Sequence, residues 1–146
     1  MITLKEFKGD GPNGISDVFA KLFEARNFAH YAHLRTKSYA QHKALGRFYE
    51  DLVGLADQFY ETQAGQYGQS KFNAGSPVKE EDPVRYMESF AKMMVDAHDM
   101  IEKKDTHLHN ILDEIAGLTY QTIYKLKYLS EITRPGRSGR RGVAPG

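Results

Sequence analysis

The chain has 146 residues, of which 40% are hydrophobic and none is cysteine. This length fits a single domain, because chains usually divide into domains only above about 250 residues, and no apolar run reaches the roughly 18 residues of a membrane span. Without cysteine there is no disulfide, thiol catalyst or thiolate zinc site, so a metal would have to bind to histidine and carboxylate side chains. The first residues, MITLKEFKGDG, lack the apolar segment of a signal peptide, and we therefore expect a cytoplasmic protein.

The net charge of +1 conceals an uneven distribution along the chain. Residues 1–130 contain 16 Lys and Arg against 18 Asp and Glu, whereas residues 131–146 contain four Arg against one Glu. Gly, Ser and Pro separate these arginines, so we expect 131–146 to be a basic flexible tail. One hypothesis is that the tail contacts DNA phosphates without reading bases, and the alternative is that it only improves solubility; its arginines are Arg134, Arg137, Arg140 and Arg141.

The first half of the chain predicts an N-terminal extension over 1–15 and then two helices. Ser16 can cap a helix over 16–35, in which apolar residues recur at steps of three and four. The hydroxyl groups of Thr36 and Ser38 can cap a second helix that ends near residue 63. The turn between these two helices is short.

The second half predicts a long loop and another pair of helices. Residues 64–81 are rich in Gly, Ser, Asn and Pro, which is typical of a loop. Asp82 followed by Pro83 is a common helix start, and this helix is predicted to continue to about residue 104. Asp105 and Thr106 can cap the last helix, which is expected to end near residue 130.

The lengths of these connections predict the topology. No segment alternates with the period of two that strands require, so the fold is expected to be all-α. Two short turns separated by one long connection match a four-helix bundle of two antiparallel hairpins with a long crossover, as in ferritin-like folds. We therefore expect residues 16–130 to form one ferritin-like domain.

Two groups of polar side chains in the first hairpin could bind a metal. His30 and His33 are three residues apart, and Asp57 and Glu61 are four apart, so each pair shares a helix face. His42 begins the second helix, but fifteen residues separate it from Asp57, which is about 22 Å of helix. One ion cannot bridge that distance, so a joint site requires two chains packed about a two-fold axis. Each pair alone is also compatible with an ordinary solvated surface.

The segment HYAHLRTKSYAQHKALGRFYEDLVGLADQFYE resembles the first hairpin of the Dps-type mini-ferritins, which carries H-x-x-H and then H-x6-Y-x7-D-x3-E. The matching positions are His30, His33, His42, Tyr49, Asp57 and Glu61. The resemblance implies a homo-oligomer with a dimer as its smallest unit, a hollow dodecamer, and sites that oxidise Fe(II) between subunits. His33 and His42 of one subunit, with Asp57 and Glu61 of its partner, would then be both the catalytic residues and the metal ligands.

The resemblance also has departures. The tryptophan expected after the second histidine is Leu34, and a further aspartate of the family is replaced by Gly46. The two imidazoles and two carboxylates that remain would bind one iron or prefer zinc, with Glu50 or His30 as possible substitutes for the missing ligand. The segment also resembles uncharacterised ferritin-like proteins of bacteriophages, which would act in the host cytoplasm.

The sequence thus supports two functions. The first is a mini-ferritin that binds, oxidises and stores iron and protects against oxidative damage, and the second is a non-enzymatic structural or interaction protein that has lost iron oxidation.

Two other features have plainer interpretations. Polar residues around 98–113 are expected to form a solvated turn, with an independent metal site as the weaker alternative. A tyrosine stripe on the last helix is expected to be buried or to contact another subunit, with electron transfer as the weaker alternative; the stripe is Tyr120, Tyr124 and Tyr128.

Overall fold

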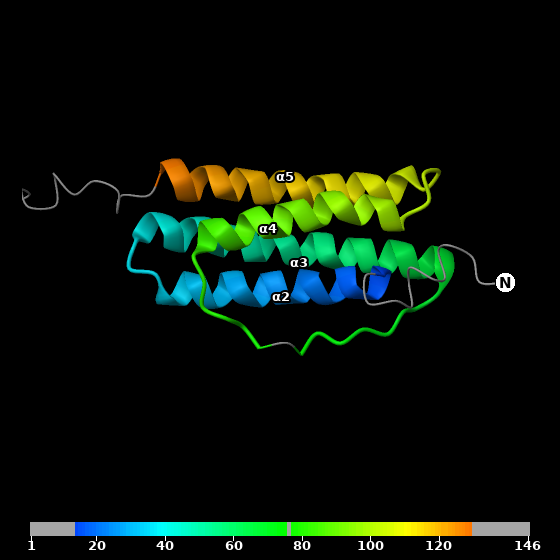
Figure 1. Ribbon diagram of the computed structural model, residues 1–146, viewed down its shortest axis with the longest axis horizontal. Helices are drawn as coiled ribbons and strands as arrows, with labels where there is room; N and C mark the ends of the chain where they lie inside the picture. Colours follow the sequence, from blue (N-terminus) through cyan, green and yellow to red (C-terminus); the bar gives the residue numbers. More distant parts are fainter. Residues whose placement is uncertain (1–13, 76, 130–146) are drawn as a thin grey trace, which may run out of the picture.

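The structure is a computed structural model that describes residues 14–75 and 77–129, and these residues form a bundle of α-helices with no β-strand among them (Figure 1). The prediction of an all-α fold is confirmed. The described elements are α2 (Ile15–Arg35), α3 (Tyr39–Tyr67), α4 (Pro83–Asp96), the 3₁₀ turn η1 (Ala97–Met100) and α5 (Thr106–Tyr128). Most of the predicted extension and all of the predicted tail, including Arg134, Arg137, Arg140 and Arg141, lie outside the described residues.

The helices pair into two antiparallel hairpins, as the loop lengths predict. α2 packs against α3, and α4 packs against α5, while the two hairpins meet mainly through α3 and α5. The connection over residues 68–82 runs back along the whole bundle, so that α3 and α4 point in the same direction (Figure 1). None of the helices that the structure describes combines the length and hydrophobicity of a transmembrane span.

The expected side-chain caps of α3 and α4 are present, while the one expected for α2 is not. The Ser38 hydroxyl accepts a hydrogen bond from the Gln41 amide at 3.2 Å, and the Asp82 carboxylate accepts one from the Arg85 amide at 2.9 Å. α2, however, begins one residue earlier than predicted, with Gly14 as its N-cap, so Ser16 lies inside the first turn. Glycine is among the residues favoured at an N-cap, where the backbone is extended instead of helical.

Two helix ends also differ from the prediction. α3 continues past residue 63 to Tyr67 and stops at Gly68, whose φ of 94° is one that glycine adopts readily. α4 ends at Asp96 instead of continuing to residue 104, and the chain then turns through η1. Acidic residues, among them Asp99, follow the end of α4, and negative charge opposes the helix dipole at a C-terminus.

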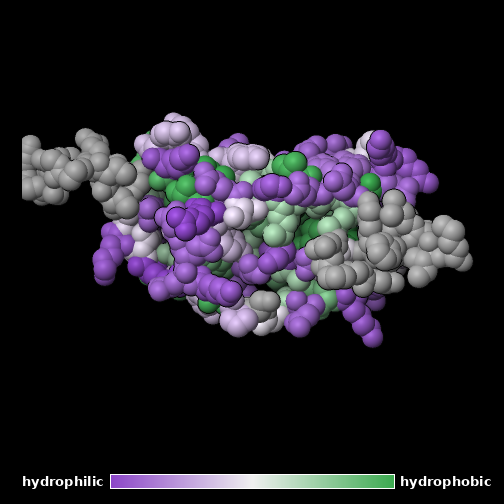
Figure 2. Space-filling view, in the orientation of Figure 1, coloured by the Kyte–Doolittle hydropathy of each residue, from purple (hydrophilic) through white to green (hydrophobic). Residues whose placement is uncertain are grey.

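One hydrophobic core holds the bundle together. Four phenylalanines are almost completely buried at its centre, and each such side chain contributes about 1.5–3 kcal/mol relative to an exposed one. They are Phe19, Phe28, Phe48 and Phe59. Figure 2 shows that, on one face of the molecule, hydrophobic residues are visible in separate patches among hydrophilic residues.

Candidate functional site at the turn between α2 and α3

Two histidines close the turn between α2 and α3. His33 lies in the last turn of α2 and His42 in the first turn of α3, and their rings stack with centroids 3.8 Å apart and planes 17° apart. The Nδ1 of His33 lies 2.6 Å from the His42 carbonyl oxygen, and the Nδ1 of His42 lies 2.8 Å from the His33 carbonyl oxygen. Because a carbonyl oxygen only accepts, each Nδ1 carries a proton and donates it.

This exchange satisfies a backbone group that the helix end leaves open. The last four carbonyls of a helix have no partner within it, and the His33 carbonyl is one of them because α2 ends at Arg35. His42 supplies the missing donor from the next helix. The pair therefore joins α2 to α3 across the three-residue connection between them, and we call His33 and His42 with their two hydrogen bonds the histidine clasp.

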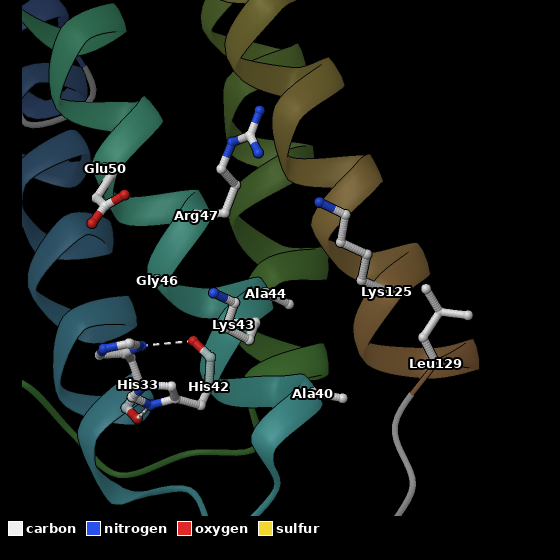
Figure 3. Close-up of a pocket in the computed structure, with 10 residues that line it drawn as sticks. All are labelled: His33, Ala40, His42, Lys43, Ala44, Gly46, Arg47, Glu50, Lys125 and Leu129. Atoms are coloured by element: carbon white, nitrogen blue, oxygen red, sulfur yellow. Dashed lines mark hydrogen bonds between the residues drawn. The ribbon is translucent and has the colours of Figure 1, made fainter.

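Gly46 allows the His33 ring to take this position. A Cβ atom placed on Gly46 would lie 2.9 Å from both Cε1 and Nδ1 of His33, which is closer than such atoms approach. Figure 3 shows the His33 ring beside α3, with its hydrogen bond to the His42 carbonyl. The aspartate that the mini-ferritin pattern has at this position therefore cannot be accommodated unless His33 moves.

The His30 ring stacks on Tyr49, whereas a site formed by all three histidines would require it to lie beside His33 and His42. Its ring stacks on Tyr49 with centroids 4.4 Å apart and planes 18° apart, while its centroid is 6.3 Å from that of His33. The Arg26 guanidinium carbon lies 5.3 Å from the centroid of the Tyr49 ring. His30 and Tyr49 thus belong to one stacked group on the outside of the hairpin.

The stacking of His33 and His42 conflicts with joint binding of one metal ion. A histidine lone pair lies in the ring plane, and a metal is held about 2.0–2.1 Å from the nitrogen. Planes that are stacked and only 17° apart do not meet that close to both rings. Within one chain, a shared ion would require one ring to turn and to lose its Nδ1 hydrogen bond.

The two predicted carboxylate ligands lie apart from the histidines. Asp57 and Glu61 are both exposed on α3, one turn apart, and helix geometry places Asp57 about 22 Å along the axis from His42. Within residues 14–75 and 77–129, no three histidine, aspartate or glutamate side chains lie close enough together to hold a metal ion. A site that combines all four residues remains a prediction about two chains.

A pocket of about 580 Å³ opens beside the histidine clasp, between the start of α3 and the end of α5 (Figure 3). Three cationic side chains line it, Lys43 and Arg47 from α3 and Lys125 from α5, together with the Glu50 carboxylate. Sequence reasoning did not find these cations. Lys43 and Arg47 are four apart, which indicated a shared face, but the neighbouring position of Lys125 depends on the packing of α5.

The polar residues at the other end of the bundle form hydrogen-bonded contacts. His98 and His109 stack with their Nδ1 atoms 2.6 Å apart, and Nε2 of His98 lies 3.0 Å from the Asp113 carboxylate. Nε2 of His109 donates to the carbonyl of Glu102 at 3.0 Å. The turn is therefore at least partly solvated, as expected, and these contacts also join η1 to the start of α5.

A buried carboxylate joins the end of α3 to the start of α5. Asp105, which is 2% exposed, accepts hydrogen bonds from the Gln66 amide at 2.9 Å and from the Tyr67 hydroxyl. Burial, followed by the hydrogen bond and negative charge of Asp105, raises the pKa of Tyr67 to about 12. Asp105 occupies the N-cap position of α5, as predicted, but its carboxylate makes no capping hydrogen bond to that helix and binds side chains of α3 instead.

The tyrosine stripe on α5 is exposed. Tyr120, Tyr124 and Tyr128 are 54%, 55% and 68% exposed, so the expectation that they are buried within the chain is wrong. The alternative, contact with another subunit, remains a prediction.

A family model matches residues 33–126, a range that contains His33, His42, Asp57 and Glu61. This chain belongs to the family of unknown function DUF5856. It is also similar to the uncharacterized 14.6 kDa protein in the mobD-ri intergenic region of Enterobacteria phage T4, with 27% identity over 115 residues that cover 79% of this chain and 89% of the phage protein. No solved structure matches the chain. The resemblance to uncharacterised phage proteins is thus supported, while neither description names a function.

Proposed function

We propose that this member of DUF5856 is a phage-encoded, non-enzymatic structural or interaction protein built on a ferritin-like bundle. The reciprocal hydrogen bonds of His33 and His42 carry the proposal, because they give both residues a structural role in the hairpin. The similarity to an uncharacterised protein of phage T4 supports the phage origin. The arrangement of the helices in two hairpins with one long crossover supports the ferritin-like class.

The energetics of the clasp favour this proposal over metal binding by the same pair. Each hydrogen bond that a turning ring gives up contributes about 0.5–1.5 kcal/mol, and a buried carbonyl left without a donor costs more. Gly46 packs against His33 where the mini-ferritin pattern has a ligand, so the position that would complete the site is part of the clasp. The hairpin is thus built to hold the two rings together.

A mini-ferritin is the second candidate function, and one observation favours it. Metal-binding histidines commonly donate one ring N–H to a backbone carbonyl, which leaves the other nitrogen to bind the metal. His33 and His42 both donate Nδ1–H in this way, which leaves each Nε2 lone pair directed elsewhere. In this candidate the exposed Asp57 and Glu61 of a partner subunit would complete iron sites, or zinc sites, in a homo-oligomer.

Iron oxidation separates the two candidates. The full chain and the variant Asp57→Asn, Glu61→Gln are loaded with Fe(II) without oxygen, peroxide is added, and the absorbance of ferric iron is compared with a protein-free control. Both side chains are exposed, so this variant is expected to keep the fold, which circular dichroism verifies. We expect equal rates in all three samples. A faster reaction in the parent chain that the variant loses would refute our proposal and support the mini-ferritin.

A further inference from the structure

The outer face of α5 carries the three exposed tyrosines, four residues apart. These tyrosines are Tyr120, Tyr124 and Tyr128, and they project away from the core. The ring centroids of Tyr124 and Tyr128 lie 5.6 Å apart. Tyrosine is enriched in protein interfaces because it combines a large apolar ring with a hydroxyl group that can remain hydrated.

Gly117 lies on the same face of α5, two turns before Tyr124. A Cβ atom placed on Gly117 would have no atom of the chain within 4 Å, so the glycine leaves open space on the surface of the helix. Glycine in the middle of a helix costs about 1 kcal/mol relative to alanine. A position without a side chain lets a second helix approach closely and place a large side chain there.

Charges of opposite sign flank the tyrosines. Asp113 and Glu114 lie toward the start of α5, and Lys125 and Lys127 lie toward its end. Among residues 14–75 and 77–129, Asp113 pairs with His98 at 3.0 Å and Lys127 pairs with Glu88 at 3.7 Å. The four charged residues and their partners Glu88 and His98 are not fully buried, so each can also meet a charge from outside.

We infer that a second copy of this chain docks on α5, antiparallel, about a two-fold axis beside Tyr120. The residue pairs that such an axis brings together are Asp113 with Lys127, Glu114 with Lys125, and Gly117 with Tyr124. Their midpoints along the helix fall at positions 120, 119.5 and 120.5, which agree within about 1.5 Å of helix rise. One axis therefore places both acids beside bases and the tyrosine ring over the glycine.

This geometry identifies the occupant as a second copy. A two-fold interface has to be complementary to itself. Along α5 the order is acids, glycine, tyrosines and bases, so an antiparallel second copy places its bases beside the acids and its tyrosine beside the glycine. A parallel arrangement would place acids against acids. Because a single helix of 23 residues supplies the surface, we expect an interface at the small end of specific contacts, below about 1,200 Å² in total, and a dimer that dissociates on dilution.

The inference rests on the proposed interaction role, and charge reversal tests it separately from the iron assay. The acidic variant combines Lys125→Glu with Lys127→Glu, so that positions 113, 114, 125 and 127 are all acidic. The basic variant combines Asp113→Lys with Glu114→Lys, so that the same four positions are all basic. Sedimentation equilibrium of the full chain over a range of concentrations is expected to show a dimer. Each variant alone is expected to dimerise at least tenfold more weakly, and an equimolar mixture of the two is expected to recover the affinity of the parent.

Two glycine variants locate the contact. Gly117→Phe places a large side chain where the Tyr124 ring of the second copy would lie and is expected to weaken the dimer. Gly54→Phe, on α3 where a Cβ also meets no atom within 4 Å, is expected to leave it unchanged. A monomeric parent, unchanged dimerisation of both charge variants, or a mixture that remains monomeric would overturn the inference. None of these results bears on the absence of iron oxidation, which the peroxide assay decides.

Discussion

At Gly46, the stability of the α3 helix and the position of the His33 ring favour different residues. Glycine weakens a helix, yet no larger residue fits beneath the His33 ring in the observed position. From the sequence alone, Gly46 is only a missing aspartate in a metal-binding pattern. The structure gives the substitution a physical cause, since the ring of a predicted ligand occupies the space where the missing side chain would begin.

Gly46→Ala is therefore expected to destabilise the protein although alanine is the better helix former. The new Cβ has to displace His33, which breaks its hydrogen bond to the His42 carbonyl, and overpacking of this kind typically costs about 1–3 kcal/mol. Gly54→Ala is the matched control, because it lies in the same helix with open space around its Cβ, and it is expected to stabilise by about 0.5–1 kcal/mol. Urea unfolding measures both; stabilisation by both variants would contradict the steric role of His33.

At the scale of the helices, local signals predicted where elements begin better than where they end. Ser38 and Asp82 cap their helices through bonds to residues three positions later, so the sequence contains the whole interaction. At the end of α3, Gly68 is a local signal, but the side chains of the last turn also bind Asp105, which is almost forty residues away. The same limit applies to the candidate site: the spacing of His33 and His42 was visible in the sequence, but their hydrogen bonds to each other's backbone were not.

The hydrogen bond between Tyr67 and Asp105 predicts that the free energy of unfolding decreases at alkaline pH. Tyr67 has a pKa of about 12 in the folded chain against 10.0 when unperturbed, so folding favours its protonated form. The stability that this residue contributes is complete below pH 10 and is lost as the pH rises through 12. Compared with Tyr67→Phe, the parent is expected to be more stable by about 1.5–3 kcal/mol at pH 9, because the hydroxyl group binds a carboxylate.

That advantage is expected to shrink between pH 10 and pH 12 in urea unfolding experiments. The comparison with Tyr67→Phe cancels the titration of other groups that both chains share. Tyr31→Phe is the control, since Tyr31 is 51% exposed, and it is expected to match the parent at each pH. An advantage that stays constant to pH 12 would mean that the Tyr67 hydroxyl does not sense Asp105.

At the scale of the whole molecule, charge is divided between the helical part and the end of the chain. Residues 1–130 carry a net charge of −2, and residues 131–146 carry +3. α5 ends beside the pocket that Lys43, Arg47 and Lys125 line, so the last described residues of the chain lie next to further positive charge. We propose that this end of the molecule is where non-specific contact with DNA phosphates would occur.

The full chain is expected to retard a DNA duplex in a gel at low salt, with retardation that falls steeply as salt increases and does not depend on sequence. Removal of residues 134–146 takes away Arg134, Arg137, Arg140 and Arg141 and is expected to abolish the shift. A truncated chain that binds DNA as well as the parent does would assign the contact to the bundle instead.

The long connection over residues 68–82 also has a consequence for the order of folding. Each hairpin forms through contacts between neighbours in sequence, whereas the packing of α5 on α3 requires this loop to close. Contacts between distant residues form slowly because loop closure costs entropy, so the two hairpins are expected to form first and their docking to limit the folding rate. Doubling the length of this loop would cost only about 0.6 kcal/mol, and its length is therefore free to vary between relatives that keep the same bundle.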